Sequence, residues 1–163
     1  MIDKLNFIFV TLFGIGKIKK IPGTFASLFT MLLLFFLFHI LNFSPNIILV
    51  IIILIFFISF FAVKIYIKDL SNKDPKEVVI DEVIGQSIPL YLYEVSHNIP
   101  KDSNDALKFY LIIFILFRFF DIAKPFPVNY FDKNFKNSFG VIMDDVVAGL
   151  YVVLVLILYM IIK

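Results

Sequence analysis

The stretch FRFFDIAKPFPVNYFDKNFKNSFGVIMDDVVAG, residues 117–149, contains the only arginine of the chain (Arg118), three lysines and four aspartates between two apolar segments. An ionised side chain at the centre of a membrane helix costs roughly 2.5–3.5 kcal/mol on insertion scales. Ionisable residues at the ends of apolar helices therefore indicate a functional site with partners. Carboxylates beside Arg and Lys suggest a divalent metal held over a phosphate.

The composition predicts an integral membrane protein with a single domain over residues 1–163. Of the 163 residues, 61% are hydrophobic and 17% are charged, far from the balance of a soluble domain. The net charge is only +2 and the lysines are scattered, which argues against nucleic acid as a partner. Cysteine is absent, which excludes disulfides, thiolate metal sites and cysteine-dependent phosphatases. We expect no cleaved signal peptide, because glycines and lysines interrupt the N-terminal apolar run.

Apolar runs predict an all-α bundle of about four to five membrane-embedded helices. Residues 25–43 and 47–63 each approach the length of a spanning helix, and the turn Ser44-Pro45-Asn46 between them predicts a helical hairpin. Residues 80–93 and 106–120 are shorter and could be tilted, re-entrant or buried. Residues 146–162 form the last predicted span. Between residues 124 and 137, Pro125 and Pro127 are expected to prevent a helix.

The distribution of lysines predicts the sidedness of the bundle. Lysines flank both ends of the predicted hairpin and recur in segments 64–76 and 124–136, whereas the loop 94–105 contains only one. The positive-inside rule places the lysine-rich segments in the cytosol. The charged candidate site then lies at the cytosolic face of a bacterial inner membrane.

Two acidic motifs look alike: IDEVIG at residues 80–85 and MDDVVAG at residues 143–149. In each, two adjacent acids precede two β-branched or apolar residues and a glycine. On a helix, Asp81 shares a face with Gly85, as Asp145 does with Gly149, so a neighbouring helix or a ligand could approach closely there. A third acid, Asp121, follows Arg118 by one helical turn.

Simpler interpretations exist for each motif. Acids in the first turn of a helix can cap free N–H groups and complement the helix dipole. Arg118 and Asp121 could form a structural salt bridge, although burying such a pair is costly. The glycines near residues 14–24 could cradle a phosphate before the first long helix, but ordinary turn and cap chemistry explains them as well. His39 and His97 have no partner at metal-ligand spacing and are interpreted as incidental.

Three blocks of sequence resemble the phosphatidylglycerophosphatase A family. They are GIGKIKKIPGTFASL at residues 14–28, VIDEVIG at residues 79–85, and FRFFDIAKPFPVNYFD at residues 117–132, continued by GVIMDDVVAG at residues 140–149. The resemblance implies an all-helical inner-membrane hydrolase of phospholipid biosynthesis. Such an enzyme removes the terminal phosphate of phosphatidylglycerophosphate with Mg²⁺ and leaves phosphatidylglycerol.

The residues and the resemblance together give one set of candidate site residues. All-oxygen ligands suit Mg²⁺, and Arg and Lys suit phosphate. The predicted catalytic residues are Asp81, Glu82, Asp121, Asp144 and Asp145. The predicted metal ligands are Asp81, Asp121, Asp144 and Asp145, with Glu82 as a further ligand or a base. The predicted substrate-binding residues are Arg118, Lys124 and Thr24.

Two alternatives remain open at this point. The chain could be a non-catalytic lipid- or cation-binding membrane protein, or it could act on another lipid monophosphate such as phosphatidic acid. The sequence indicates neither the number of metal ions nor the oligomeric state, and it does not distinguish attack by water from attack by an aspartate.

Overall fold

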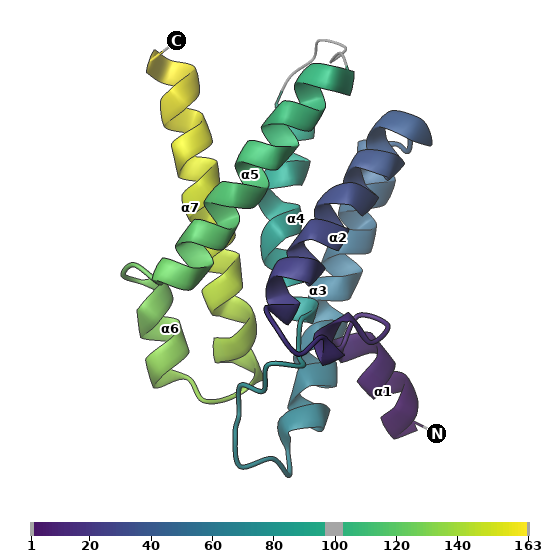
Figure 1. Ribbon diagram of the computed structural model, residues 1–163, viewed down its shortest axis with the longest axis vertical. Helices are drawn as coiled ribbons and strands as arrows, with labels where there is room; N and C mark the ends of the chain where they lie inside the picture. Colours follow the sequence, from purple (N-terminus) through teal and green to yellow (C-terminus); the bar gives the residue numbers. More distant parts are fainter. Residues whose placement is uncertain (1, 97–102, 163) are drawn as a thin grey trace.

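The computed structural model describes residues 2–96 and 103–162, and this part of the chain is a bundle of helices (Figure 1). The long helices are α2 (Pro22–Phe35), which continues as the π-helical turn η2 (Phe36–Ile40), α3 (Pro45–Ile67), α4 (Ile80–Val95), α5 (Ser103–Ala123) and α7 (Ser138–Ile162). Short elements, α1 (Ile2–Val10), the 3₁₀ turn η1 (Ile15–Lys17) and α6 (Val128–Asn134), gather at the lower end in Figure 1. His97 lies outside the described residues.

Three helices in the described part of the chain are long and apolar enough to cross a membrane. They are the continuous segment Pro22–Ile40, then Pro45–Ile67 and Ser138–Ile162. The predicted all-helical membrane bundle is therefore confirmed, but the count of four to five embedded helices is not. With 16 residues, α4 has a length of about 24 Å, less than the roughly 30 Å of a hydrocarbon core.

The first two long helices are joined by a short turn, as the predicted hairpin requires, but they pack mainly on other helices rather than on each other. α2 packs on α4 and α5, whereas α3 packs on α1, α4 and α7. α2 and α3 both pack on α4 because α4 is the central helix of the bundle. The most extensive contact of α4 is with α7. Its apolar face meets a core that includes Met31, Tyr110, Phe117, Ala148 and Val152.

Two glycines allow α4 and α7 to approach at backbone distance. A Cβ atom on Gly85 would lie 2.6 Å from the carbonyl oxygen of Asp145, and one on Gly149 would collide with the carbonyl oxygen of Gly85. The glycines of the two similar acidic motifs thus face each other, as the helical spacing predicted for a close helix–helix approach. This contact brings the acids that precede both glycines to the same end of the bundle.

Two boundary predictions were wrong. α7 begins at Ser138 rather than at residue 146, because GVIM continues the apolar helical pattern upstream of the acids. Asp144 and Asp145 are therefore not in the first turn, and the capping interpretation does not apply to them. α6 forms after Pro127, although prolines were expected to prevent a helix there, because a proline at the start of a helix interrupts no helical hydrogen bond.

A candidate phosphate and metal site at one end of the bundle

All eight predicted site residues line one cavity of about 650 Å³ at the end of the bundle that carries the loops. The cavity is bounded by the start of α2, the α3–α4 linker, the start of α4, the end of α5 and the early turns of α7. The predicted residues are Thr24, Asp81, Glu82, Arg118, Asp121, Lys124, Asp144 and Asp145. Sequence segments more than a hundred residues apart therefore supply one charged chamber.

Three carboxylates converge on the wall formed by α4 and α7. One oxygen atom from each of Asp81, Glu82 and Asp145 can be chosen so that all three lie within 4.8 Å of one another. Asp145 is only 3% exposed, and Oε2 of Glu82 is buried without a hydrogen-bond partner. Repulsion among three close carboxylates is relieved by a divalent cation, and oxygen donors without nitrogen or sulfur suit Mg²⁺.

Two side chains, Asp121 and Ser27, hold Arg118 in place. Nη1 of Arg118 forms an ion pair with Oδ2 of Asp121 at 2.8 Å, which confirms the pairing expected one helical turn apart. The same Nη1 donates to Oγ of Ser27 at 3.3 Å, and Ser27 in turn donates to the Gly23 carbonyl. Nε of Arg118 is buried without a partner, so the guanidinium retains donor capacity for a ligand in the cavity.

Lys124 is held between two aspartates, one on α6 and one on α7. Nζ of Lys124 lies 2.8 Å from Oδ2 of Asp144 and 2.8 Å from Oδ1 of Asp132. Burial works to lower the pKa of Lys124, but the carboxylates of Asp144 and Asp132 raise it above the ordinary lysine value. The lysine is therefore a fixed positive charge. Its backbone has φ +43°, the left-handed conformation that commonly ends a helix but usually belongs to glycine.

Asp121 and Asp144, both predicted as metal ligands, line the cavity but contact cations instead of the three-carboxylate cluster. Glu82, predicted as a ligand or a base, belongs to that cluster. A ligand role for Asp121 and Asp144 thus stays a prediction.

Sequence reasoning missed several residues of the site. Asn72, Asp74 and Lys76 of the α3–α4 linker and Lys19 before α2 also line the cavity, and Asp132 of α6 holds Lys124. In the sequence, this linker is a polar stretch between two apolar runs. Its only local signal was an Asn-x-Asp pair. In the structure this pair forms a turn in which the Asp74 N–H donates to Oδ1 of Asn72. Such pairs are common in surface loops, so the pair alone does not indicate a site.

Glycine at position 23 is part of the site. A Cβ atom there would collide with Oε1 of Glu82 and lie 3.4 Å from Nη1 of Arg118. The first turn of α2 therefore packs directly against side chains of the site, and the phosphate cradle suggested for residues 14–24 stays a prediction.

Comparison with known proteins identifies the family. The family model for phosphatidylglycerophosphatase A matches residues 8–160. The chain belongs to the phosphatidylglycerophosphatase A family. It is therefore a phosphatase, and the resemblance seen in the three sequence blocks is confirmed.

Individual relatives agree with this assignment. The chain is 37% identical over 143 residues to phosphatidylglycerophosphatase A of Haemophilus influenzae, covering 88% of this chain and 81% of the relative. It is 31% identical over 141 residues to the Escherichia coli protein of the same name, covering 84% and 73%. A candidate phosphatidylinositol-3-phosphatase of Bacteroides thetaiotaomicron is 34% identical over 142 residues, covering 85% and 83%. No solved structure matches the chain.

Proposed function

We propose that this chain hydrolyses the terminal phosphomonoester of phosphatidylglycerophosphate and releases phosphatidylglycerol and inorganic phosphate. The bond between phosphorus and the glycerol oxygen breaks, the oxygen of water is added to phosphorus, and a proton passes to the glycerol oxygen. The observation that carries the proposal is that Arg118 and Lys124 line the same cavity as three converging carboxylates. The family and the names of two relatives support the substrate.

The carboxylate cluster supports a Mg²⁺ requirement. The buried and unpartnered Oε2 of Glu82 and the proximity of Asp81 and Asp145 fit an oxygen-liganded divalent cation. Such a cation, when bound, neutralises charge on the transferring phosphoryl group. Asp121 and Asp144 line the same cavity. They can join the metal ligands if Arg118 and Lys124, which now pair with them, move toward the substrate.

The cationic residues of this chain have distinct roles in the proposal. Arg118 offers guanidinium N–H groups to phosphate oxygens while Ser27 and Asp121 hold its orientation. Lys124 supplies a fixed charge that stays protonated throughout the neutral range. Thr24, in the first turn of α2, lines the cavity with a hydroxyl group that can donate to the phosphate.

The placement of lysines supports an inner-membrane enzyme with its site on the cytosolic face. The end of the bundle that carries the site also carries the lysines of η1, of the α3–α4 linker and of α6. Under the positive-inside rule this is the cytosolic end. An enzyme there that makes a bilayer phospholipid would serve phospholipid biosynthesis.

A second substrate class has specific support. The Bacteroides relative is named for a phosphatidylinositol phosphate, which also carries a phosphomonoester on a headgroup joined through a phosphodiester. Phosphatidic acid, the alternative raised by the sequence, carries only the monoester.

The decisive experiment measures phosphate release by the purified protein in detergent. Phosphatidylglycerophosphate, phosphatidylinositol 3-phosphate and phosphatidic acid are each supplied with Mg²⁺ or with EDTA. We expect Mg²⁺-dependent release, greatest with phosphatidylglycerophosphate. Asp145→Asn should abolish it, whereas the matched control Asp69→Asn, at an exposed position outside the cavity, should not.

Three results would count against the proposal. Phosphate release that is unaffected by EDTA would refute the proposed metal requirement. Faster phosphate release from phosphatidylinositol 3-phosphate or phosphatidic acid would refute phosphatidylglycerophosphate as the preferred substrate. No release from any of the three, by a protein that is folded, would favour the non-catalytic binding protein.

A further inference from the structure

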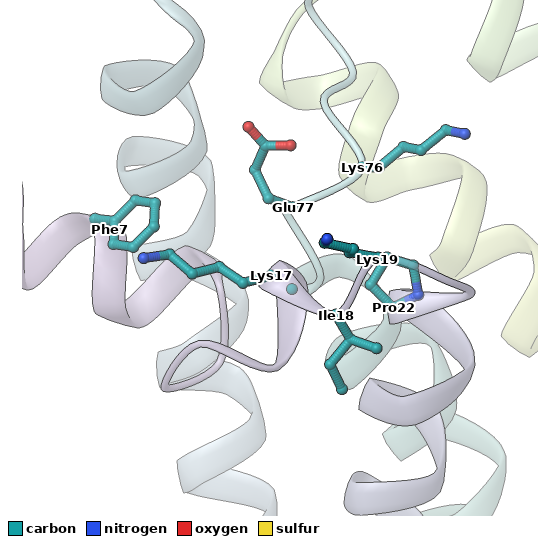
Figure 2. Close-up of a pocket in the computed structure, with 8 residues that line it drawn as sticks. Phe7, Lys17, Ile18, Lys19, Pro22, Lys76 and Glu77 are labelled. Carbon is teal, nitrogen blue, oxygen red and sulfur yellow. The ribbon is translucent and has the colours of Figure 1, made fainter.

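A second cavity, of about 350 Å³, lies beside the candidate site (Figure 2). Three lysines line it, Lys17 and Lys19 from the N-terminal loop and Lys76 from the α3–α4 linker. In Figure 2, Lys17 extends toward Phe7, Lys76 extends the opposite way, and Lys19 lies between them. The positive charges are therefore spread along the cavity rather than gathered at one point.

Specific contacts hold this cavity open between two segments far apart in sequence. Gly16 is buried against the backbone of Glu77, where a Cβ atom would collide with the carbonyl oxygen. This contact fixes the 3₁₀ turn that carries Lys17 against the linker that carries Lys76. Nζ of Lys17 also lies 4.5 Å from the centroid of the Phe7 ring, within the range of a cation–π interaction.

The cavity has an excess of positive charge. Glu77 is the one acid among its lining residues, and it accepts a hydrogen bond from Oη of Tyr66 at 3.3 Å. The ion pairs seen within residues 2–96 and 103–162 use other cations: His39, Lys108, Arg118 and Lys124. The three ammonium groups are thus available to an anionic ligand.

The two cavities are contiguous. Lys19, Pro22 and Lys76 line both of them, so the second cavity, here called the lysine cavity, adjoins the first, here called the carboxylate cavity. The loop between η1 and α2 also exposes apolar side chains: Ile18 is 39% and Ile21 is 63% exposed. Lysines interleaved with exposed apolar residues are typical of a segment that lies in the headgroup region of a bilayer.

We propose that the lysine cavity binds the phosphodiester of the lipid headgroup while the terminal monoester occupies the carboxylate cavity. This inference rests on the proposed function and deepens it, because it assigns a specificity determinant. A headgroup with both a diester and a monoester fills both cavities. Phosphatidic acid, with one phosphate, fills only the first and forgoes the lysine contacts.

The test compares the unchanged protein with Lys17→Gln, because Lys17 lines only the lysine cavity, whereas Lys19 and Lys76 also line the carboxylate cavity. The matched control is Lys20→Gln, an exposed neighbour in the same loop that lines neither cavity. We expect kcat/KM for phosphatidylglycerophosphate to fall about tenfold or more, mainly through KM, as expected for loss of charge-assisted hydrogen bonds. The kcat/KM for phosphatidic acid should change less than about twofold.

A binding measurement keeps the inference separate from the proposed activity. Native mass spectrometry compares retention of phosphatidylglycerol, which keeps only the diester, with retention of diacylglycerol, which has no phosphate. Lys17→Gln should reduce the preference for phosphatidylglycerol. If the unchanged protein releases no phosphate, the proposed function fails and this retention alone decides the inference. Equal losses on both substrates, or unchanged kinetics and unchanged retention, would overturn it.

Discussion

Replacing Gly85 by alanine tests whether the backbone contact between α4 and α7 sets the geometry of the site. The new Cβ atom would lie 2.6 Å from the carbonyl oxygen of Asp145 and 2.7 Å from Cε2 of Phe117. Cβ contacts shorter than 3.0 Å are essentially never seen, and the first clash is with backbone, which cannot rotate away. To restore ordinary contact at 3.4 Å from 2.6 Å, the helices must separate by roughly 0.8 Å at this point.

This separation should affect activity more than stability. Overpacking costs roughly 1–3 kcal/mol, but the better helix propensity of alanine offsets roughly 1 kcal/mol of that cost. The remaining loss lowers the melting temperature by only a few degrees, at about 2–4 °C per kcal/mol. Asp81 and Glu82 on α4, by contrast, move away from Asp145 on α7. Misplacement of catalytic groups by about 1 Å can cost about a hundredfold in rate, so we expect kcat to fall at least about tenfold.

The assay is phosphate release from phosphatidylglycerophosphate in detergent, with thermal unfolding measured on the same samples. Leu150→Ala is the matched control, because position 150 follows Gly149 on α7 but its side chain is 45% exposed. Gly149→Ala should resemble Gly85→Ala, and the double variant should lose less than the two single losses added, since both act on one contact. A Gly85→Ala protein that keeps more than half of its kcat would refute the reasoning.

Three further perturbations act on other parts of the molecule. Arg118→Lys keeps the charge but loses the planar fork, so we expect kcat/KM to fall about tenfold or more; full activity would remove the guanidinium from phosphate binding. Burial works to raise the pKa of Asp132, but the hydrogen bond from Lys124 lowers it below the ordinary 3.8, so its stabilising contribution exists above pH 3.8 and is lost as the pH falls. The difference in melting temperature between the unchanged protein and Asp132→Asn should therefore shrink from pH 7 to pH 3, and a constant difference would contradict this. His39→Phe removes the contact between Nε2 of His39 and Oε1 of Glu94 at 3.1 Å, about 25 Å along the helix from Pro22; stability should fall without loss of kcat, and a large loss of kcat would show that the two ends are coupled.

The helices could be predicted where local pattern alone determines them. The long apolar runs located α2, α3, α4, α5 and α7, because burial in lipid and in the core requires the same apolar residues. Boundaries were less certain where the polar site interrupts the pattern. The start of α7 was placed after its acids because charges resemble a helix end, whereas in the structure they lie inside the helix and face a cavity.

The eight candidate residues could be found because ionisable groups are conspicuous among apolar neighbours. Their partners could not be found, because a tertiary contact leaves no local mark on a polar loop. Asp132 and Asp74 read as ordinary loop residues until the fold brings them to Lys124 and the cavity. His39 was interpreted as incidental, yet it contacts Glu94, more than fifty residues away in sequence.

The early start of α7 has a kinetic consequence. Its 25 residues extend about 37 Å, longer than a hydrocarbon core of about 30 Å, and Asp144 and Asp145 lie about 10 Å from its first residue. With the C-terminal end of α7 at one edge of the hydrocarbon core, the acids lie near the other edge, so we expect a substrate to react without leaving the bilayer. The rate should follow the mole fraction of substrate in the membrane surface, and dilution with inert lipid at constant bulk substrate concentration should slow the enzyme.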